Sequence, residues 1–240
     1  MANLIIDIGN TALKAAWADG ITLGKTYRYQ GERTMDFILS LTEKMKPETM
    51  VISSAKDLSA GNLARLEKEC RNLLVLDASH SRIMEENGLP AYLTPDRAAS
   101  IIASRFLFKG KGCTIMDFGT TLAVDFLDEE GRYTGGNLSV GCRTRFKALN
   151  RYSKTLPLVD TPEEYPEQGN DVESSMMAGV IQGMLYEIEG YRAAYPQNII
   201  VFTGGDSIYF AKRMKNSIFV VCNLVLMGLA LIADKYGKIN

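Results

Sequence analysis

Apolar residues in the first part of the chain fall into short runs that predict strands, followed by segments with helical spacing. Three successive strands are predicted at 2–8, 11–18 and 21–29. Helices at 34–46 and 58–70 then alternate with short strands at 50–53 and 73–76. Strands that alternate with helices predict an α/β fold with a mostly parallel sheet covered by helices.

The rest of the chain continues the alternation of apolar strands and helices. After a helix from about 95 to 108, we expect a strand–turn unit at 113–127, a Gly-rich loop at 135–141, a basic helix at 143–149, a loop at 156–170, a long helix at 172–195, strands at 198–202 and 218–221, and a closing helix at 223–235.

The first strand ends in a short motif that recurs later in the chain. Residues 4–14 read LIIDIGNTALK, and residues 115–122 read IMDFGTTL, so that Asp7 and Asp117 each follow an apolar strand. A glycine two residues after each Asp lets the backbone approach an anion closely. Two such turns favour a duplicated fold with a ligand between its halves, and we expect domains at 1–109 and 110–240.

Composition excludes several classes of function. The 240 residues are 46% hydrophobic and 23% charged, with a net charge of −1, so no general basic field exists to attract nucleic acid or an anionic membrane. We see no signal peptide and no apolar stretch of the ~20 residues that a membrane span needs. The four scattered cysteines fit a reducing cytoplasm, and a single histidine excludes His-based metal sites and Ser-His triads.

Two further segments each allow two interpretations from the residues alone. Thr94 is a plausible N-cap, Pro95 fits the first helical position, and Asp96 is then either a favourable charge at a helix start or a catalytic carboxylate. Arg97 is either a helix-surface residue or a partner for a substrate carboxylate. The pair Gly204-Gly205 after a buried strand suggests contact with a flat ligand such as a nucleoside, or merely a tight turn.

Taken together, the three strand-end turns resemble those of the actin-like sugar-kinase and chaperone ATPase superfamily. DxGNTxxK at 7–14, DFGT at 117–120, GGxLxxG at 135–141 and TGG at 203–205 resemble type III pantothenate kinases. This resemblance implies a homodimer of duplicated actin-like (ribonuclease H-like) domains, each a mixed sheet flanked by helices, with active sites at the dimer interface. It implies phosphorylation of pantothenate by ATP, with Mg²⁺ and a monovalent cation (K⁺ or NH₄⁺), in coenzyme A synthesis.

The resemblance also implies a role for individual residues. The ATP-binding set would be Asp7, Ile8, Gly9, Asn10, Thr11, Ala12, Leu13, Lys14, Thr120, Gly204 and Gly205. Asp7 would lie near the divalent metal, Asp117 would bind the monovalent cation, and Asp96 would be the base that accepts the pantothenate hydroxyl proton. The substrate-binding set would be Asn87, Thr94, Pro95, Asp96, Arg97 and Val172.

The chain departs from the family pattern on the substrate side. In the pattern YxxPxxLGxDR, Asn87 stands at the tyrosine and Thr94 at the glycine, and Val172 replaces the threonine of GxxT. Val140 replaces a proline in GGxxxPG. These changes leave two alternatives open: a non-catalytic regulator that binds nucleotide or pantothenate compounds, and a kinase for another small hydroxylated acceptor.

Overall fold

The computed structural model describes residues 2–80, 82–215 and 217–237, and it divides into two compact units. Unit 1 contains the described residues up to Leu107 together with those from Asn223 onward, and unit 2 contains Phe108–Cys222. We expected a single boundary at 109/110. The assignment of 223–237 to the C-terminal domain is therefore corrected, because the closing helix packs on the first sheet.

Unit 1 is built on a mixed five-stranded sheet with the order β3-β2-β1-β4-β5 in its described residues. Its strands are β1 (Asn3–Ile8), β2 (Leu13–Asp19), β3 (Thr22–Tyr29), β4 (Thr49–Ser54) and β5 (Asn72–Leu76). The central strand β1 is antiparallel to β2 and parallel to β4. Asp7, near the carboxyl end of β1, therefore lies at the same sheet edge as the carboxyl ends of β4 and β5.

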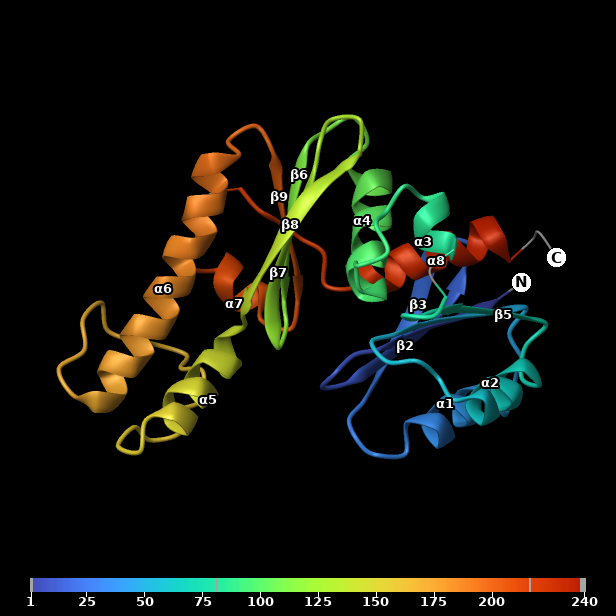
Figure 1. Cartoon of the computed structure of the whole chain (residues 1–240), viewed down its shortest axis with the longest axis horizontal. Coiled ribbons are helices and arrows are strands. Elements are labelled where there is room, and N and C mark those ends of the chain that lie inside the picture. The colour runs from blue at the N-terminus through green and yellow to red at the C-terminus, as the bar shows by residue number, and fades with distance from the viewer. Residues whose placement is uncertain (1, 81, 216, 238–240) are drawn as a thin grey trace. The chain divides into compact units, whose positions relative to one another are not determined.

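Helices cover both faces of this sheet (Figure 1). On one face, Leu4 and Ile6 of β1 pack with Ile38 of α1 (Thr34–Thr42) and Leu66 of α2 (Ala60–Glu67). On the other lie α4 (Pro95–Leu107) and α8 (Leu224–Tyr236), which also pack on each other. A short helix, α3 (Arg82–Glu86), precedes α4.

Unit 2 repeats the strand order of unit 1, as β10-β9-β6-β7-β8. Its strands are β6 (Cys113–Phe118), β7 (Thr121–Leu127), β8 (Tyr133–Val140), β9 (Ile199–Gly204) and β10 (Phe219–Val220). Here β6 takes the place of β1, being antiparallel to β7 and parallel to β9. The matching topology confirms the duplicated fold that the paired turns predict.

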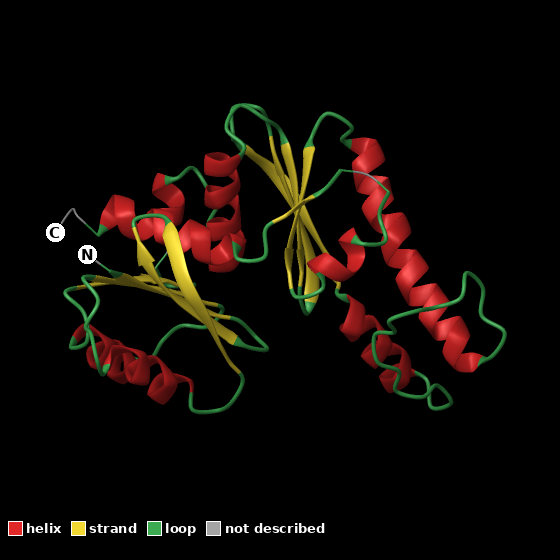
Figure 2. Ribbon diagram, turned by 180° about the vertical axis from the view of Figure 1, so that it is seen from behind, coloured by secondary structure: helices red, strands yellow, loops and turns green. Residues whose placement is uncertain are grey.

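The core of unit 2 lies between this sheet and its helices (Figure 2). The helices are α5 (Cys142–Tyr152), α6 (Val172–Ala194) and α7 (Ser207–Ala211). Phe118 of β6 lies at the centre, with its ring centroid 4.7 Å from that of Phe202 and 5.2 Å from that of Phe210. These rings pack the ends of β6 and β9 against α7 and hold the turns that follow these strands.

The Gly-rich segment expected as a loop is mostly an edge strand. Residues 133–140 form β8, which pairs antiparallel with β7 despite its two glycines. Gly135 has a φ of +140° next to the register shift between Phe126 and Leu127. An edge position and an irregularity in the pairing are where glycine is tolerated within a strand, so the loop prediction is wrong for these residues.

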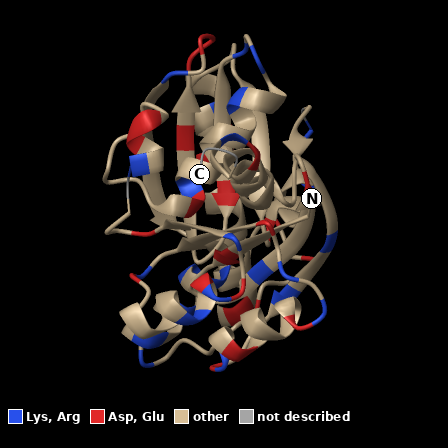
Figure 3. Cartoon of the chain, turned by 90° about the vertical axis from the view of Figure 1, so that its right-hand side faces the viewer, with Lys and Arg blue, Asp and Glu red and all other residues tan. Residues whose placement is uncertain are grey.

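Lys and Arg positions are interspersed with Asp and Glu positions along the helices, strands and loops (Figure 3). All four cysteines are free thiols. Within the described ranges, no helix is both long and apolar enough to cross a membrane.

Candidate functional site

The turn between β1 and β2 presents polar groups at the edge of the first sheet. Gly9 N donates to Ala12 O over 3.2 Å, which closes the turn, and Gly9, Asn10 and Thr11 are exposed. Asp7 pairs directly with Lys14 across the two strands, so both side chains lie on one face of the sheet. A carboxylate, an ammonium group and exposed backbone in one turn suit a phosphate bound together with a cation.

Asp96 lies in the first turn of α4, as the sequence predicts. Pro95 is the first helical residue, and Thr94 O accepts the first helical hydrogen bond from Ala98 N at 3.0 Å. Asp96 is half-buried, and its negative charge is favoured at a helix N-terminus. This places a carboxylate where solvent and a small acceptor can reach it, on a segment fixed by the helix.

Arg97 is 7% exposed, so its interpretation as a helix-surface residue is wrong. Sequence spacing alone did not distinguish the two, because the burial of this position depends on what packs over the start of α4. A buried guanidinium needs charged or polar partners to offset its desolvation. Arg97 is therefore a buried cation, next to Asp96 in the sequence, rather than a solvated surface charge.

Asn87 follows α3 directly and is held from three sides. Its Nδ2 donates to Ile83 O at 2.7 Å and to Tyr236 Oη at 3.1 Å, and its carbonyl oxygen accepts from Arg105 Nη1 at 2.7 Å. Both amide protons are thus used within unit 1. A substrate could reach this side chain through Oδ1, so the assignment of Asn87 to substrate binding stays a prediction.

The second turn, between β6 and β7, is locked to the start of α5. Gly119 N donates to Thr121 O at 3.0 Å, and Thr120 O accepts from Gly141 N at 3.1 Å and from Thr144 Oγ1 at 2.8 Å. A Cβ added at Gly141 would collide with the carbonyl oxygen of Gly119. Glycine at 141 therefore permits this contact, while Thr120 is exposed.

Asp117 and the glycine pair meet at the carboxyl ends of β6 and β9. In this register Asp117 pairs with Thr203, and Phe118 pairs with Gly204. Gly204 has a φ of +89°, and an added Cβ would overlap Asp117 Oδ1 and the Phe118 backbone. Ser207 Oγ donates to Gly204 O at 2.8 Å and fixes the turn. Gly204 is thus needed for both its conformation and its close contact, while Gly205 is exposed.

Sequence reasoning missed Asp206, the carboxylate that follows the glycine pair. Its backbone N–H donates to Phe118 O at 3.3 Å, and burial raises the pKa of its carboxyl despite the opposing charge of Arg143. An acidic residue directly after TGG was the available signal. Asp206 adds a second carboxylate near the end of β6. When ionised, this carboxylate would repel an anion bound at the same turn.

The oxygen donors of these turns fit the two proposed cations. Mg²⁺ in kinases is commonly held by one or two carboxylates, substrate phosphates and waters, and it does not need a cage of protein ligands. The described residues contain no group of three or more His, Cys, Asp or Glu side chains placed to hold a metal ion. A single carboxylate at Asp7 is compatible with Mg²⁺ on ATP, and the carboxylate of Asp117 is an oxygen donor of the kind that a hard monovalent cation accepts.

Val172 lies at a large apolar groove on unit 2. It is the first residue of α6, is 51% exposed, and follows Asp171, which caps the helix by accepting from Ser174 N at 2.7 Å. The groove has a volume of about 1210 Å³ and runs between α5 and the start of α6. Apolar residues that line it include Val140, Leu149, Tyr152, Val172 and Met176.

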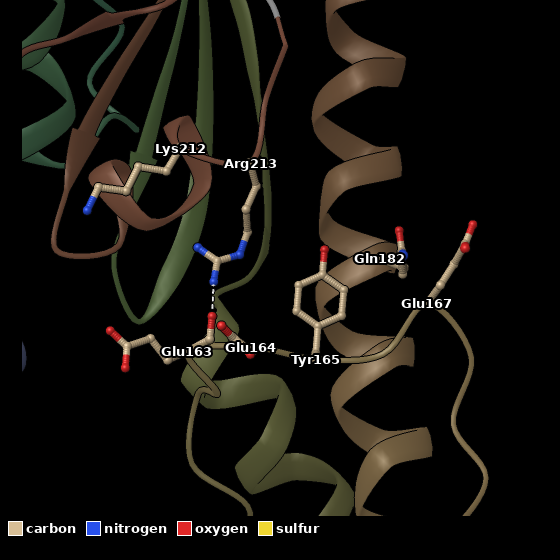
Figure 4. Close-up of a pocket in the computed structure, with 7 residues that line it drawn as sticks. All are labelled: Glu163, Glu164, Tyr165, Glu167, Gln182, Lys212 and Arg213. Carbon is tan, nitrogen blue, oxygen red and sulfur yellow. Dashed lines mark hydrogen bonds between the residues drawn. The ribbon is translucent and has the colours of Figure 1, made fainter.

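A smaller hollow of about 590 Å³ lies between α6, α7 and the loop that precedes α6 (Figure 4). The Arg213 guanidinium lies 3.5 Å from the Tyr209 ring centroid and also donates to Glu163 O, while Tyr209 Oη donates to Pro162 O at 2.7 Å. Tyr165 and Gln182 border the other side. These contacts fasten the loop to α7, and none of the predicted site residues lines this hollow.

The predicted residues are divided between the units. Unit 1 holds the 7–14 turn, Asn87, and the segment from Thr94 to Arg97. Unit 2 holds Asp117, Thr120, Gly204, Gly205 and Val172. The 7–14 turn lies at the carboxyl end of β1, and Asp117 with Gly204 lies at the carboxyl ends of β6 and β9. Asn87 is instead bonded to Tyr236 at the end of α8, Thr94–Arg97 begin α4, and Val172 lies on the α6 groove.

Comparison with known proteins identifies a family for this chain. A family model described as type III pantothenate kinase matches residues 3–194. A protein of that description from Bacteroides fragilis is 37% identical over 233 residues, which cover 95% of each chain.

Comparison with solved structures identifies proteins with a similar fold. A chain described as a Baf family transcriptional activator from Campylobacter jejuni gives a TM-score of 0.62 at 18% identity, covering 97% of this chain and 98% of its own. An activator of 2-hydroxyisocaproyl-CoA dehydratase from Clostridium difficile, with bound ADPNP, gives 0.60 at 15% identity, covering 99% and 96%. At these identities the likeness concerns the fold alone, which is that of actin-like ATPases.

Proposed function

Because this chain belongs to the type III pantothenate kinase family and is a pantothenate kinase of coenzyme A synthesis, we propose that Asp96 is its catalytic base. Asp96 accepts the proton of the pantothenate primary hydroxyl as the oxygen attacks the γ-phosphorus of ATP. The bond between that phosphorus and the bridging oxygen of ADP breaks, and ADP leaves. The observation that carries this assignment is the half-buried Asp96 carboxylate, fixed in the first turn of α4 beside a buried Arg97.

The chain's own groups position the ATP phosphates. We assign the phosphates to the backbone of residues 7–14 with Lys14, and to Thr120, with Gly204 and Gly205 next to the adenosine. In-line phosphoryl transfer depends mainly on positioning and on neutralising phosphate charge, so backbone N–H groups and Lys14 serve both needs. When bound, Mg²⁺ near Asp7 and K⁺ or NH₄⁺ at Asp117 would supply further positive charge.

Acceptor recognition rests on the start of α4. Pantothenate carries a carboxylate, and we assign its recognition to Arg97, the buried cation in the first turn of α4, together with the neighbouring Thr94 and Pro95. Asn87 and Val172, which depart from the family pattern, belong to the same acceptor set. Their replacement predicts altered acceptor affinity rather than loss of ATP binding, because the ATP turns keep the pattern.

A second copy of this chain is the proposed occupant of the groove between α5 and α6. Leu149, Tyr152 and Val172 are exposed large apolar residues that line it, and a continuous apolar surface on a kinase of this family supports a homodimer. Val172 would then contribute to an active site at the interface.

The free cysteines support the expected cytoplasmic location, because unpaired thiols are typical of reducing compartments.

The experiment is ADP release from ATP and Mg²⁺, with and without pantothenate, in K⁺ and then in Na⁺. The proposal predicts pantothenate-dependent release that is faster in K⁺. Turnover only with another hydroxylated acceptor would identify the protein as a kinase for that acceptor rather than for pantothenate. Binding of pantothenate without turnover would instead favour a non-catalytic regulator.

Light scattering of wild type and Tyr152→Asp tests the proposed dimer. A wild-type protein that is monomeric at assay concentration contradicts the dimer.

A further inference from the structure

The segment that carries Asp96 begins at a well-defined helix end. Leu89 N donates to Met84 O at 3.0 Å and Gly88 N donates to Glu85 O at 2.9 Å, with Gly88 at a φ of +65°. This pattern is a Schellman motif, in which Asn87 is the C-cap of α3. Met84 and Leu89, 2% and 3% exposed, supply the apolar contact that accompanies it.

The remainder of the segment is short and internally bonded. Leu93, which is 3% exposed, donates its N–H to Pro90 O at 3.1 Å, and α4 begins two residues later. The hydrogen bonds of Leu89 and Leu93, and the burial of both side chains, constrain the segment that connects Asn87 to Asp96.

Asn87 is the point where three helices are tied together. Its Nδ2 bonds the last turn of α3 and the Tyr236 hydroxyl at the end of α8, and its carbonyl oxygen accepts from Arg105 in the last turn of α4. The C-terminal end of α8 is itself anchored to the sheet, because Asn72 Nδ2 of β5 donates to Gly237 O at 2.9 Å. Tyr236 thus projects from an anchored helix end onto Asn87.

We propose that Tyr236 and Asn87 form a latch by which the C-terminal helix positions Asp96 for phosphoryl transfer. Asn87 stands where the family pattern has a tyrosine, and in this chain the hydroxyl of a tyrosine from α8 bonds the Asn87 side chain. Tyr236 is a positioning residue, because its hydroxyl bonds Asn87 and the Glu86 carboxylate and acts through the end of α3 and the 87–96 segment. The inference rests on the proposed role of Asp96.

The test compares Tyr236→Phe, Asn87→Ala and the double variant, with Tyr186→Phe as the control. Tyr186 is an exposed tyrosine outside the latch, at 71% exposure. Loss of the hydroxyl lowers kcat about 10-fold with KM for ATP unchanged, since small misplacements of a reacting group cost up to ~100-fold. The double variant falls no further than either single variant, because the two residues act as one unit.

Hydrogen exchange supplies a readout independent of activity. In Tyr236→Phe, amides of 87–96 exchange faster while amides of β6 and β9 do not change. Wild-type kcat with unchanged exchange in Tyr236→Phe overturns the latch, and so does an additive loss in the double variant. Asp96→Asn is measured in parallel: wild-type turnover in that variant refutes the proposed base, whereas its loss beside an active Tyr236→Phe refutes the latch alone.

Discussion

Gly204 is the residue whose replacement tests the structure of the unit 2 turn most sharply. Its φ of +89° strains any other residue, and an added Cβ would meet Asp117 Oδ1 and both the N and O of Phe118. Gly204→Ala therefore has two costs, one for backbone conformation and one for overlap. Relief of the overlap requires movement of β6 relative to β9, since two of the three atoms belong to the backbone.

The two costs can be estimated separately. A left-handed conformation costs a non-glycine residue about 1–2 kcal/mol. Forcing a methyl group into a packed site adds about 1–3 kcal/mol. The free energy of unfolding of Gly204→Ala should thus fall by about 2–5 kcal/mol.

Two glycines of unit 2 provide matched controls. Gly110 has a φ of +76° with nothing within 4 Å of an added Cβ, so Gly110→Ala should lose about 1–2 kcal/mol for conformation alone. Gly205 has no positive φ, and an added Cβ would have only an ordinary contact with Phe118 O at 3.9 Å, so Gly205→Ala should change stability by about 0.5 kcal/mol or less. Urea unfolding measures all three, and calorimetry with ADP measures nucleotide binding. A Gly204→Ala loss equal to that of Gly110→Ala would refute the overlap.

Three further predictions concern buried groups. Ser104→Ala should raise the free energy of unfolding by about 1 kcal/mol in urea, because this buried hydroxyl has no hydrogen-bond partner among the described residues; a loss of stability contradicts this. Burial favours a higher pKa for Asp77, but hydrogen bonds led by that from His80 outweigh it and lower the pKa. Its stabilising contribution is therefore complete above about pH 4 and lost below it, and urea unfolding of Asp77→Asn should depend less on pH between 3 and 5 than wild type. Burial raises the pKa of Cys142 to about 11, so iodoacetamide at pH 8 should label exposed Cys222 and spare Cys142, as mass spectrometry can check.

Local sequence signals predicted the elements that carry the site. The apolar run ending at Asp7, and its copy ending at Asp117, gave the two central strands because buried parallel strands need continuous apolar residues. Pro95 after Thr94 located the start of α4, because both residues act through local backbone geometry. The order of these signals was enough to predict the duplicated α/β fold.

Features that depend on long-range packing could not be predicted in this way. The closing helix α8 joins unit 1, because its apolar residues find their partners on β1 and α4, far away in sequence. The glycines of β8 indicate a loop locally, yet β7 supplies a pairing partner. The burial of Arg97 and the bond between Asn87 and Tyr236 likewise join residues whose proximity no local pattern encodes.

The most direct test of the proposed mechanism is the kcat of Asp96→Asn for pantothenate at saturating ATP, measured by ADP release. Asparagine keeps the shape of the side chain but cannot accept the hydroxyl proton, and a positioned base contributes about 10²–10⁴-fold to the rate. We predict a loss of kcat of that size, with ADP affinity and thermal unfolding unchanged. Turnover at the wild-type rate would contradict Asp96 as the base. That result would not affect the proposed ATP-phosphate turns, which do not depend on Asp96.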